Sequence, residues 1–186
     1  MRISGGRLGG RTVRVPPGII RPSMDRMRES VFAALGDLSS SSFLDLFSGS
    51  GIIALEAASR GACPVEAVES DRKKRGILLA NASIAPERIN CRFMTVELYV
   101  RRARRSFDRI FCDPPFSYRY KTELLRAIAS SPLMSASTLL LIHRPRAEQI
   151  SPRSGDTLVL RETRLYGASA VDFLRRKTNY DGEENT

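Results

Sequence analysis

Residues that could bind a transition metal or form disulfides are scarce in this sequence. There is one histidine, His143, and there are three cysteines, Cys63, Cys91 and Cys112, among 186 residues. The cysteines are odd in number and far apart, so they fit neither a disulfide framework nor a zinc-binding pattern. We therefore expect no metal site and a reducing, cytoplasmic environment.

Long apolar runs are also absent. No stretch approaches the roughly 20 residues that a transmembrane helix needs. Residues 139–142, Leu-Leu-Leu-Ile, instead predict a buried strand. Residues 1–6 contain no apolar segment of the kind found in secretory signals. The chain length suits one domain with a small appendage. We expect a monomer that does not associate with membranes.

Acidic residues are too few to balance the basic ones, and the net charge is +10. Residues 1–28 hold seven arginines against a single acid, Asp25. A glycine-containing stretch with this charge favours a surface that binds nucleic-acid phosphates. The candidate RNA-binding residues are Arg2, Arg7, Arg11, Arg14, Arg21 and Arg26. For the basic clusters at 72–75 and 101–105, RNA binding and an ordinary solvated helix surface both stay open.

From residue 42 onward, strand-like and helix-like segments alternate. Strands are predicted at 42–47, 64–69, 90–95, 107–112 and 136–142, and helices at 51–60, 71–83, 96–105 and 119–130. This alternation predicts an α/β fold with a doubly wound, Rossmann-like parallel sheet. Residues 158–165 and 170–175, on either side of Tyr166-Gly167, predict an antiparallel hairpin that closes one edge of the sheet.

The N-terminal part differs from this pattern. Residues 2–15 predict a small β-hairpin with glycine turns, followed by a helix that Ser23 caps and Gly36 ends. We therefore divide the chain into a basic hairpin and helix (1–36), an α/β domain (37–177) and a flexible tail (178–186).

A glycine loop follows the first predicted strand of the α/β domain: Asp45-Leu46-Phe47-Ser48-Gly49-Ser50-Gly51. Open α/β sheets bind ligands beyond the carboxyl ends of their strands, and glycines there let the backbone approach the ligand. Glu69, at the end of the second strand, is placed to accept hydrogen bonds from a ribose diol.

Two cofactors compete for this loop. Gly49 and Gly51, with Ala54, satisfy a loose dinucleotide fingerprint. However, a carboxylate at Asp45 suits an ammonium and a sulfonium better than a pyrophosphate. The chain also offers no second domain to hold a hydride acceptor. S-adenosylmethionine (SAM) is therefore favoured.

The second motif, Asp113-Pro114-Pro115-Phe116, follows the fourth predicted strand. An exocyclic amine on a base is a poor nucleophile, and positive charge grows on its nitrogen during methyl transfer. The carboxylate of Asp113 and the carbonyl of Pro114 can accept its N–H bonds and stabilise that charge. Phe116 can stack on a base that has left its neighbours. These three residues are the candidate catalytic group.

With these motifs, the chain resembles the bacterial methyltransferases that modify guanine N2 in 16S ribosomal RNA. The resemblance extends from Ile3 to about Arg176. It includes the stretch Arg21-Pro22-Ser23-Met24-Asp25-Arg26-Met27-Arg28-Glu29, which distinguishes this family from adenine-N6 DNA methyltransferases with a similar Pro-Pro loop. The resemblance implies a class I SAM methyltransferase domain over 37–177.

The resemblance also implies roles for individual residues. Asp45, Phe47, Gly49 and Gly51 would lie at the methionine end of SAM and Glu69 at its ribose. Thr95 would lie near the adenine, with Glu97 as the alternative. The implied substrate is 16S rRNA, either naked or within a small-subunit assembly particle. Two alternative functions stay open: an adenine-N6 methyltransferase on nucleic acid, and a non-catalytic RNA-binding assembly factor.

Three further residues can be interpreted in two ways. For His143 we favour a surface or loop position over a role as a base, because the methylated amine can lose its proton to water. Tyr118 and Tyr120 could stack on RNA or only cover the helix predicted at 119–130.

Overall fold

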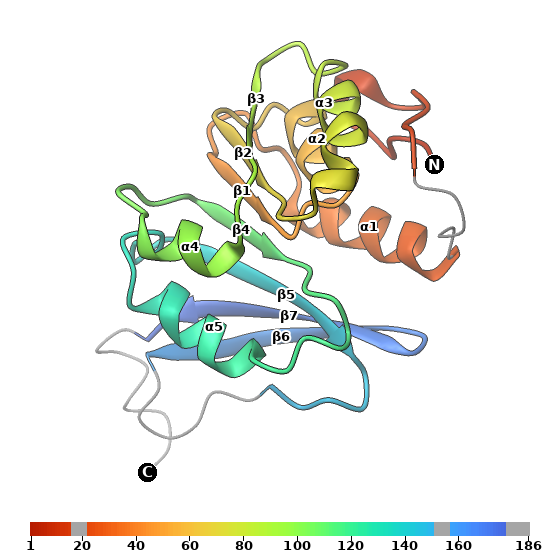
Figure 1. The fold of residues 1–186 in the computed structure, drawn as a ribbon. Coiled ribbons are helices and arrows are strands. Elements are labelled where there is room, and N and C mark those ends of the chain that lie inside the picture. The colour runs from red at the N-terminus through yellow and green to blue at the C-terminus, as the bar shows by residue number, and fades with distance from the viewer. Residues whose placement is uncertain (16–21, 151–156, 178–186) are drawn as a thin grey trace.

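The computed structural model describes residues 1–15, 22–150 and 157–177. In these ranges, seven strands form one mixed sheet in the order β3-β2-β1-β4-β5-β7-β6 (Figure 1). The parallel strands are β1 (Phe43–Leu46), β2 (Val65–Val68), β3 (Ile89–Arg92), β4 (Arg109–Cys112) and β5 (Leu139–Pro145). The antiparallel strands β6 (Leu158–Tyr166) and β7 (Ser169–Arg176) complete one edge. The predicted doubly wound fold with a C-terminal hairpin is confirmed.

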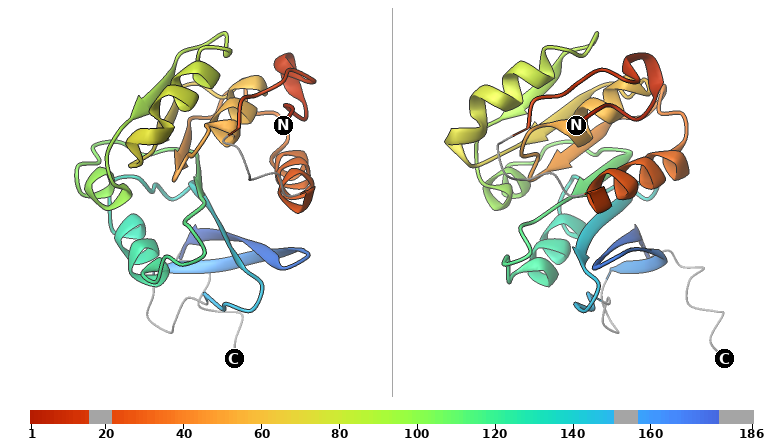
Figure 2. Two further views of the ribbon diagram at one scale, coloured as in Figure 1. Left: turned by 45° about the vertical axis from the view of Figure 1, so that its right-hand side comes forward. Right: turned by 90° about the vertical axis from the view of Figure 1, so that its right-hand side faces the viewer.

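Helices cover both faces of the sheet. On one face lie α1 (Pro22–Leu35), α2 (Ile52–Ser59) and α3 (Arg75–Ala82), and on the other lie α4 (Val96–Arg101) and α5 (Lys121–Ala129) (Figures 1 and 2). Each face has its own apolar core, because side chains alternate along every strand: Phe111 and Leu141 belong to the first core, and Ile110 and Leu140 to the second. No helix in the described ranges is long and apolar enough to cross a membrane.

The order in which successive strands are added to the sheet reverses between β1 and β4: β2 and β3 lie on one side of this point, and β4 and β5 on the other. Leu46, the last residue of β1, is paired with Val68 of β2 on one side and with Cys112 of β4 on the other. The segments that follow these three strands therefore emerge side by side. This pairing brings the glycine loop (47–51), Glu69 and Asp113 to one edge of the sheet, where doubly wound folds bind their ligands.

The N-terminal segment (1–15) is a loosely paired loop that lies on α2. Its only β-bridge joins Arg2 to Thr12, and a 3₁₀ turn (Gly6–Leu8) lies between them. Gly6 has φ 74°, and a Cβ there would lie 2.1 Å from the Ser59 carbonyl oxygen. Only glycine fits there, because the backbone of the segment contacts α2 directly.

A buried carboxylate fastens this segment to the helices. Glu56 of α2 is fully buried. It accepts hydrogen bonds from the Ser4 amide at 2.6 Å and the Arg28 Nε at 2.9 Å, and it also pairs with Arg60. Arg28 in turn donates to Asp25 at 2.7 Å. Charges buried in this way are stable only when paired, so these contacts depend on one another.

The two ends of α1 differ in how well the sequence predicted them. Helix α1 begins at Pro22, so Ser23 lies inside the helix and the prediction that Ser23 is its cap is wrong. The fixed φ of proline suits the first helical position. Gly36 ends the helix as predicted, with φ 67° and its amide donating to the Phe32 carbonyl at 3.1 Å. Arg21 and the predicted tail at 178–186 lie outside the described residues, and the proposed division at residue 36 stays a prediction.

Candidate active site

The glycine loop has an unusual backbone. Gly49 and Gly51 have φ 58° and 81°, and Phe47 also has a positive φ, 64°. Such a conformation in a residue with a side chain costs of order 1 kcal/mol or more, and it is typically found where a loop is shaped for a ligand. A Cβ on Gly51 would lie 2.6 Å from a Leu78 methyl carbon, so a side chain at this position would also have to displace that methyl group.

Asp45 lies beneath this loop with 1% of its surface exposed. Its Oδ2 accepts hydrogen bonds from the Ser48 hydroxyl at 2.5 Å and the Ala54 amide at 3.2 Å. Its Oδ1 is buried and has no hydrogen-bond partner among the described residues. Burial raises the pKa of Asp45 to about 7, and the negative charges of Asp113 and Glu69 add to this increase. Within the described ranges, the Asp45 carboxyl group thus has no cationic partner.

Glu69 links the end of β2 to the glycine loop. Its Oε2 accepts a hydrogen bond from the Gly49 amide and its Oε1 from the Asp71 amide, both at 2.8 Å. The Lys74 ammonium is 3.7 Å from Oε2. Glu69 is 5% exposed, at the edge where the strands end. Its position agrees with the role predicted for it, and the ribose contact itself stays a prediction.

Asp113 lies directly beside the glycine loop, since its amide donates to the Leu46 carbonyl at 3.1 Å. Its side chain is 25% exposed, and Oδ1 is 2.8 Å from Nδ1 of His143. Within the described residues, neither Asp113 Oδ2 nor the Pro114 carbonyl accepts a hydrogen bond. Phe116 is 42% exposed. Two acceptors and one aromatic face are therefore available to a ligand.

The structure also reveals a residue that we did not predict, Lys121 at the start of α5. It is 2% exposed, and its Nζ donates to the carbonyls of Phe116 at 3.2 Å and Tyr118 at 2.6 Å. It also pairs with Glu148 at 3.0 Å. Lys121 therefore fixes the chain that follows the Pro-Pro motif. Lysines are rarely buried, so a lone lysine in the sequence gave no signal of this role.

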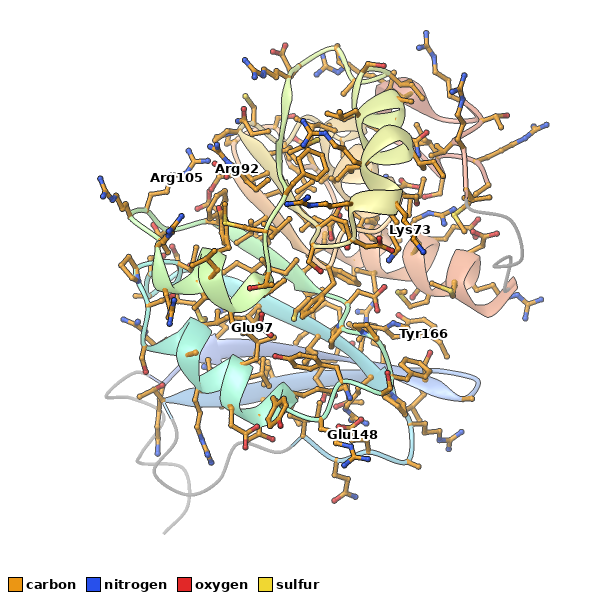
Figure 3. All side chains as sticks on the ribbon, viewed as in Figure 1. Lys73, Arg92, Glu97, Arg105, Glu148 and Tyr166 are labelled. Atoms are coloured by element: carbon orange, nitrogen blue, oxygen red, sulfur yellow. The ribbon has the colours of Figure 1, made fainter. Side chains whose placement is uncertain are left out.

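Thr95 and Glu97 lie at the start of α4 and both are exposed. The Thr95 hydroxyl caps the helix by accepting from the Leu98 amide at 3.3 Å. Glu97, labelled in Figure 3, accepts a hydrogen bond from the Tyr118 hydroxyl at 2.6 Å, and the Tyr118 ring packs edge-on against Phe47 at 5.4 Å. Tyr118 thus contacts Phe47, the first residue of the glycine loop, and is not only a helix-covering side chain. Thr95, with Glu97 as the alternative, stays the predicted contact of an adenine.

The expectation that His143 occupies a surface or loop position is wrong. Strand β5 continues to Pro145, so His143 lies inside it and is 4% exposed. The strand is longer than its apolar run because β7 pairs with it as far as Pro145.

Most of the predicted RNA-binding arginines are exposed. This holds for Arg2, Arg7, Arg11, Arg14 and Arg26, and none of them forms an ion pair within the described residues. Arg28 is different: it was counted in the positive charge of the N-terminal stretch, but it is 3% exposed and paired with Asp25 and Glu56. That part of the charge is not available to RNA.

The end of the N-terminal segment is linked to the glycine loop through a side chain of α3. The side chain of Asn81 on α3 binds both the amide of Arg14 at 3.0 Å and its carbonyl at 2.8 Å. The same side chain donates to the Ser50 carbonyl at 2.7 Å. One buried amide therefore connects the end of the N-terminal segment to the glycine loop.

The internal basic clusters are partly neutralised. Arg105 of the second cluster pairs with Glu66 at 2.5 Å, as does Arg92, outside both clusters, at 3.2 Å; both arginines are labelled in Figure 3. Arg75 packs over the Phe93 ring at 4.4 Å. In contrast, Arg101, Arg102 and Arg104 line an open depression of about 550 Å³. The two interpretations of these clusters both stay open.

Comparison with known proteins agrees with this geometry. A profile of the family described as "Conserved hypothetical protein 95" matches residues 1–175. This chain belongs to that family. Ribosomal RNA small subunit methyltransferase D of Escherichia coli (strain K12) is 30% identical over 146 residues, which are 76% of this chain and 73% of that protein. The predicted rRNA methyltransferase family is thus confirmed.

Solved structures of other proteins share the fold. The "Putative methyltransferase yhhF from Escherichia coli" superposes with a TM-score of 0.84 at 27% identity, over 95% of this chain and 98% of that chain. A more distant structure is that of "SMU.776, a putative methyltransferase complexed with SAH" (S-adenosylhomocysteine). It is 17% identical, superposes with a TM-score of 0.65, and the match covers 84% of this chain and 50% of that chain. The latter comparison concerns the fold alone.

Proposed function

We propose that this protein is a SAM-dependent methyltransferase that acts on the exocyclic N2 amine of a guanine in 16S rRNA. The observation that supports this most strongly is the position of the Asp113-Pro114-Pro115-Phe116 loop against the end of β1. Its free acceptors and its exposed ring are next to the glycine loop, as a reaction between a bound cofactor and a flipped base requires.

The charge of the site supports SAM over a dinucleotide. Three carboxylates, Asp45, Glu69 and Asp113, gather at this edge of a protein whose net charge is +10. The amides that a pyrophosphate would need are in use, since Gly49 donates to Glu69 and Ala54 donates to Asp45. The unpartnered Oδ1 of Asp45 suits a cationic ligand. Bound SAM would supply a methyl group on a positively charged sulfur.

The Asp113 carboxylate and the Pro114 carbonyl would hold the target amine. Both accept hydrogen bonds without competing as donors, so they suit an NH₂ group whose nitrogen becomes positive as the methyl group arrives. Proline contributes a carbonyl without an N–H of its own. Phe116 would stack on the base and keep it in place, and Glu69 and the glycine loop would bind the cofactor.

The relatives favour rRNA as the substrate, since they are named as methyltransferases of small-subunit rRNA. The exposed arginines near the N-terminus would bind its phosphates and add a salt-dependent, sequence-independent part to the affinity. We place the enzyme in the cytoplasm, where it would act as a monomer on 16S rRNA or on an assembly particle that contains it.

The experiment that tests this function is nucleoside mass spectrometry of small-subunit rRNA from a strain that lacks the protein. We expect N2-methylguanosine to decrease and to be restored by the wild-type protein but not by Asp113→Ala. A decrease in N6-methyladenosine would instead indicate the adenine-N6 alternative. If no methylated nucleoside changes and the purified protein transfers no methyl group to rRNA, a non-catalytic assembly role replaces the proposed function.

A further inference from the structure

The sheet places the single histidine of the chain next to the proposed catalytic aspartate. Cys112 of β4 is paired with Ile142 of β5, so the following residues, Asp113 and His143, are neighbours. Both continue the row of Phe111 and Leu141, on the face that α1, α2 and α3 cover. Two side chains on the same face of adjacent strands are close enough to bond, and the His143 Nδ1 is 2.8 Å from the Asp113 Oδ1.

The direction of this hydrogen bond follows from its chemistry. An ionised carboxylate only accepts, so Nδ1 of His143 carries the hydrogen. His143 is 4% exposed, whereas the Asp113 side chain is 25% exposed. The bond therefore anchors one oxygen of Asp113 from inside the sheet. It leaves Oδ2, which accepts nothing from the described residues, open to the site.

The same ring also supports the far end of the loop. The ring centroids of His143 and Phe116 are 5.4 Å apart, with an angle of 59° between the planes. His143 thus contacts both the carboxylate proposed to orient the amine and the ring proposed to stack on the base. These two contacts fix the position of the Asp113 carboxylate relative to the Phe116 ring.

The other ring nitrogen indicates which role His143 has. Nε2 is buried and has no hydrogen-bond partner in the described part of the chain. A proton relay needs a partner on both sides of the ring, and none of the described residues provides one at Nε2. The contacts of His143 are therefore those of a group that holds Asp113 in place.

We propose that His143 is a positioning residue for methyl transfer. Its Nδ1–H fixes the Asp113 carboxylate so that Oδ2 faces the target amine together with the Pro114 carbonyl. This inference depends on the amine-binding role of Asp113 in the proposed function. Small displacements of a positioned group reduce rates strongly, by about 10²-fold for roughly 1 Å. We therefore expect loss of this hydrogen bond to slow catalysis and leave binding nearly unchanged.

The test compares variants that remove the donor with one that retains it. His143→Phe keeps a ring against Phe116 but has no N–H, and His143→Leu serves in its place if the larger ring prevents folding. His143→Asn offers an amide N–H near the position of Nδ1. The substrates are SAM with a labelled methyl group and small ribosomal subunits from a strain that lacks the protein. We expect kcat of His143→Phe to fall by about 10- to 100-fold, with KM for RNA and the affinity for S-adenosylhomocysteine within about twofold of wild type. His143→Asn should recover most of the rate.

A double-mutant cycle separates positioning from a general structural role. In the Asp113→Ala background, His143→Phe should cause no further decrease in rate, because the group that it positions is gone. An equal decrease in both backgrounds would refute the proposal. So would a His143→Phe enzyme at the wild-type rate, or a His143→Asn enzyme as slow as His143→Phe.

Mass spectrometry of the wild-type product keeps this result separate from the proposed function. If the wild type methylates a base other than guanine, the proposed specificity fails while the comparison of variants still tests His143. If the wild type transfers no methyl group, the proposed function and the role of His143 both fail.

Discussion

Replacing Asp45 with asparagine should change how the stability of the ligand-free protein depends on pH. Burial raises the pKa of Asp45 to about 7, whereas an unfolded aspartate has a pKa of about 3.9. The folded protein therefore keeps the Asp45 proton to a higher pH than the unfolded chain does. Where the folded state binds more protons, the free energy of unfolding falls as the pH rises. The stabilising effect of the protonated form is complete below about pH 4 and is lost by about pH 7.

The size of this effect follows from the two pKa values. Between about pH 5 and about pH 7.5, ionisation of Asp45 should lower the free energy of unfolding by about 2.5 kcal/mol. Asparagine cannot ionise, and its side-chain oxygen can still accept the hydrogen bonds from Ser48 and Ala54. Its NH₂ group would occupy the position of the unpartnered Oδ1, at a cost that does not depend on pH.

The measurement is urea unfolding of both proteins at the two pH values, followed by circular dichroism because the chain has no tryptophan. Other titrating groups are common to both proteins, so their effects cancel in the difference. The wild type should lose about 2.5 kcal/mol more than Asp45→Asn between the lower and the higher pH. Parallel stability curves for the two proteins would refute the reasoning.

Four further changes test the candidate site and the proposed RNA surface. Asp113→Ala should lower the rate of methyl transfer by about 10²–10³ with little change in cofactor affinity. Rapid kinetics measures the rate, and calorimetry measures the affinity. Near-normal turnover by the folded variant would mean that another group orients the amine. Glu69→Ala should weaken binding of S-adenosylhomocysteine by roughly 1.5–3 kcal/mol in calorimetry, and Glu69→Gln, which retains one acceptor oxygen, should lose less; equal affinities would contradict the ribose contact. Asn81→Ala should destabilise the protein by about 1 kcal/mol per lost hydrogen bond and weaken cofactor binding, because it frees Ser50; an unchanged affinity in calorimetry would show that the loop holds its shape without Asn81. Replacing Arg2, Arg7, Arg11 and Arg14 with alanine should reduce the slope of log affinity for RNA against log salt by about 0.7–0.9 per lost phosphate contact. Cofactor affinity should stay the same, because Arg14 binds Asn81 through its backbone. Equal slopes for the two proteins would make the clusters at 72–75 and 101–105 the next candidates for the RNA-binding surface.

The order and type of the elements could be predicted because the apolar pattern changes its period from strand to helix along the chain. The glycine loop and Asp113 could be placed at one edge because the carboxyl ends of parallel strands always share an edge. The position of Ser23 could not be predicted reliably, since both Pro22 and Ser23 are common near the start of a helix.

The supporting contacts of the site could not be predicted, because they depend on pairing between distant segments. His143 lies inside a strand because β7 pairs with β5 beyond the apolar run. Lys121 is buried because the chain after Phe116 folds back and offers two carbonyls to it. Arg28 has the same charge as its exposed neighbours, and only the location of Glu56 distinguishes it. Nothing in the sequence around these three residues indicates that they are buried.

The contact between the N-terminal segment and α2 limits how this protein can be shortened. Deleting residues 1–13 to remove the arginines proposed to bind RNA would also remove Ile3, Leu8 and Val13 from the apolar core, and it would take the Ser4 donors from the buried Glu56. The truncated protein would lose stability as well as charge, so its failure to bind RNA would carry no information about the arginines. The proposed RNA surface therefore cannot be transferred or removed as a module, and it can be dissected only by substituting side chains while the backbone of the segment is kept.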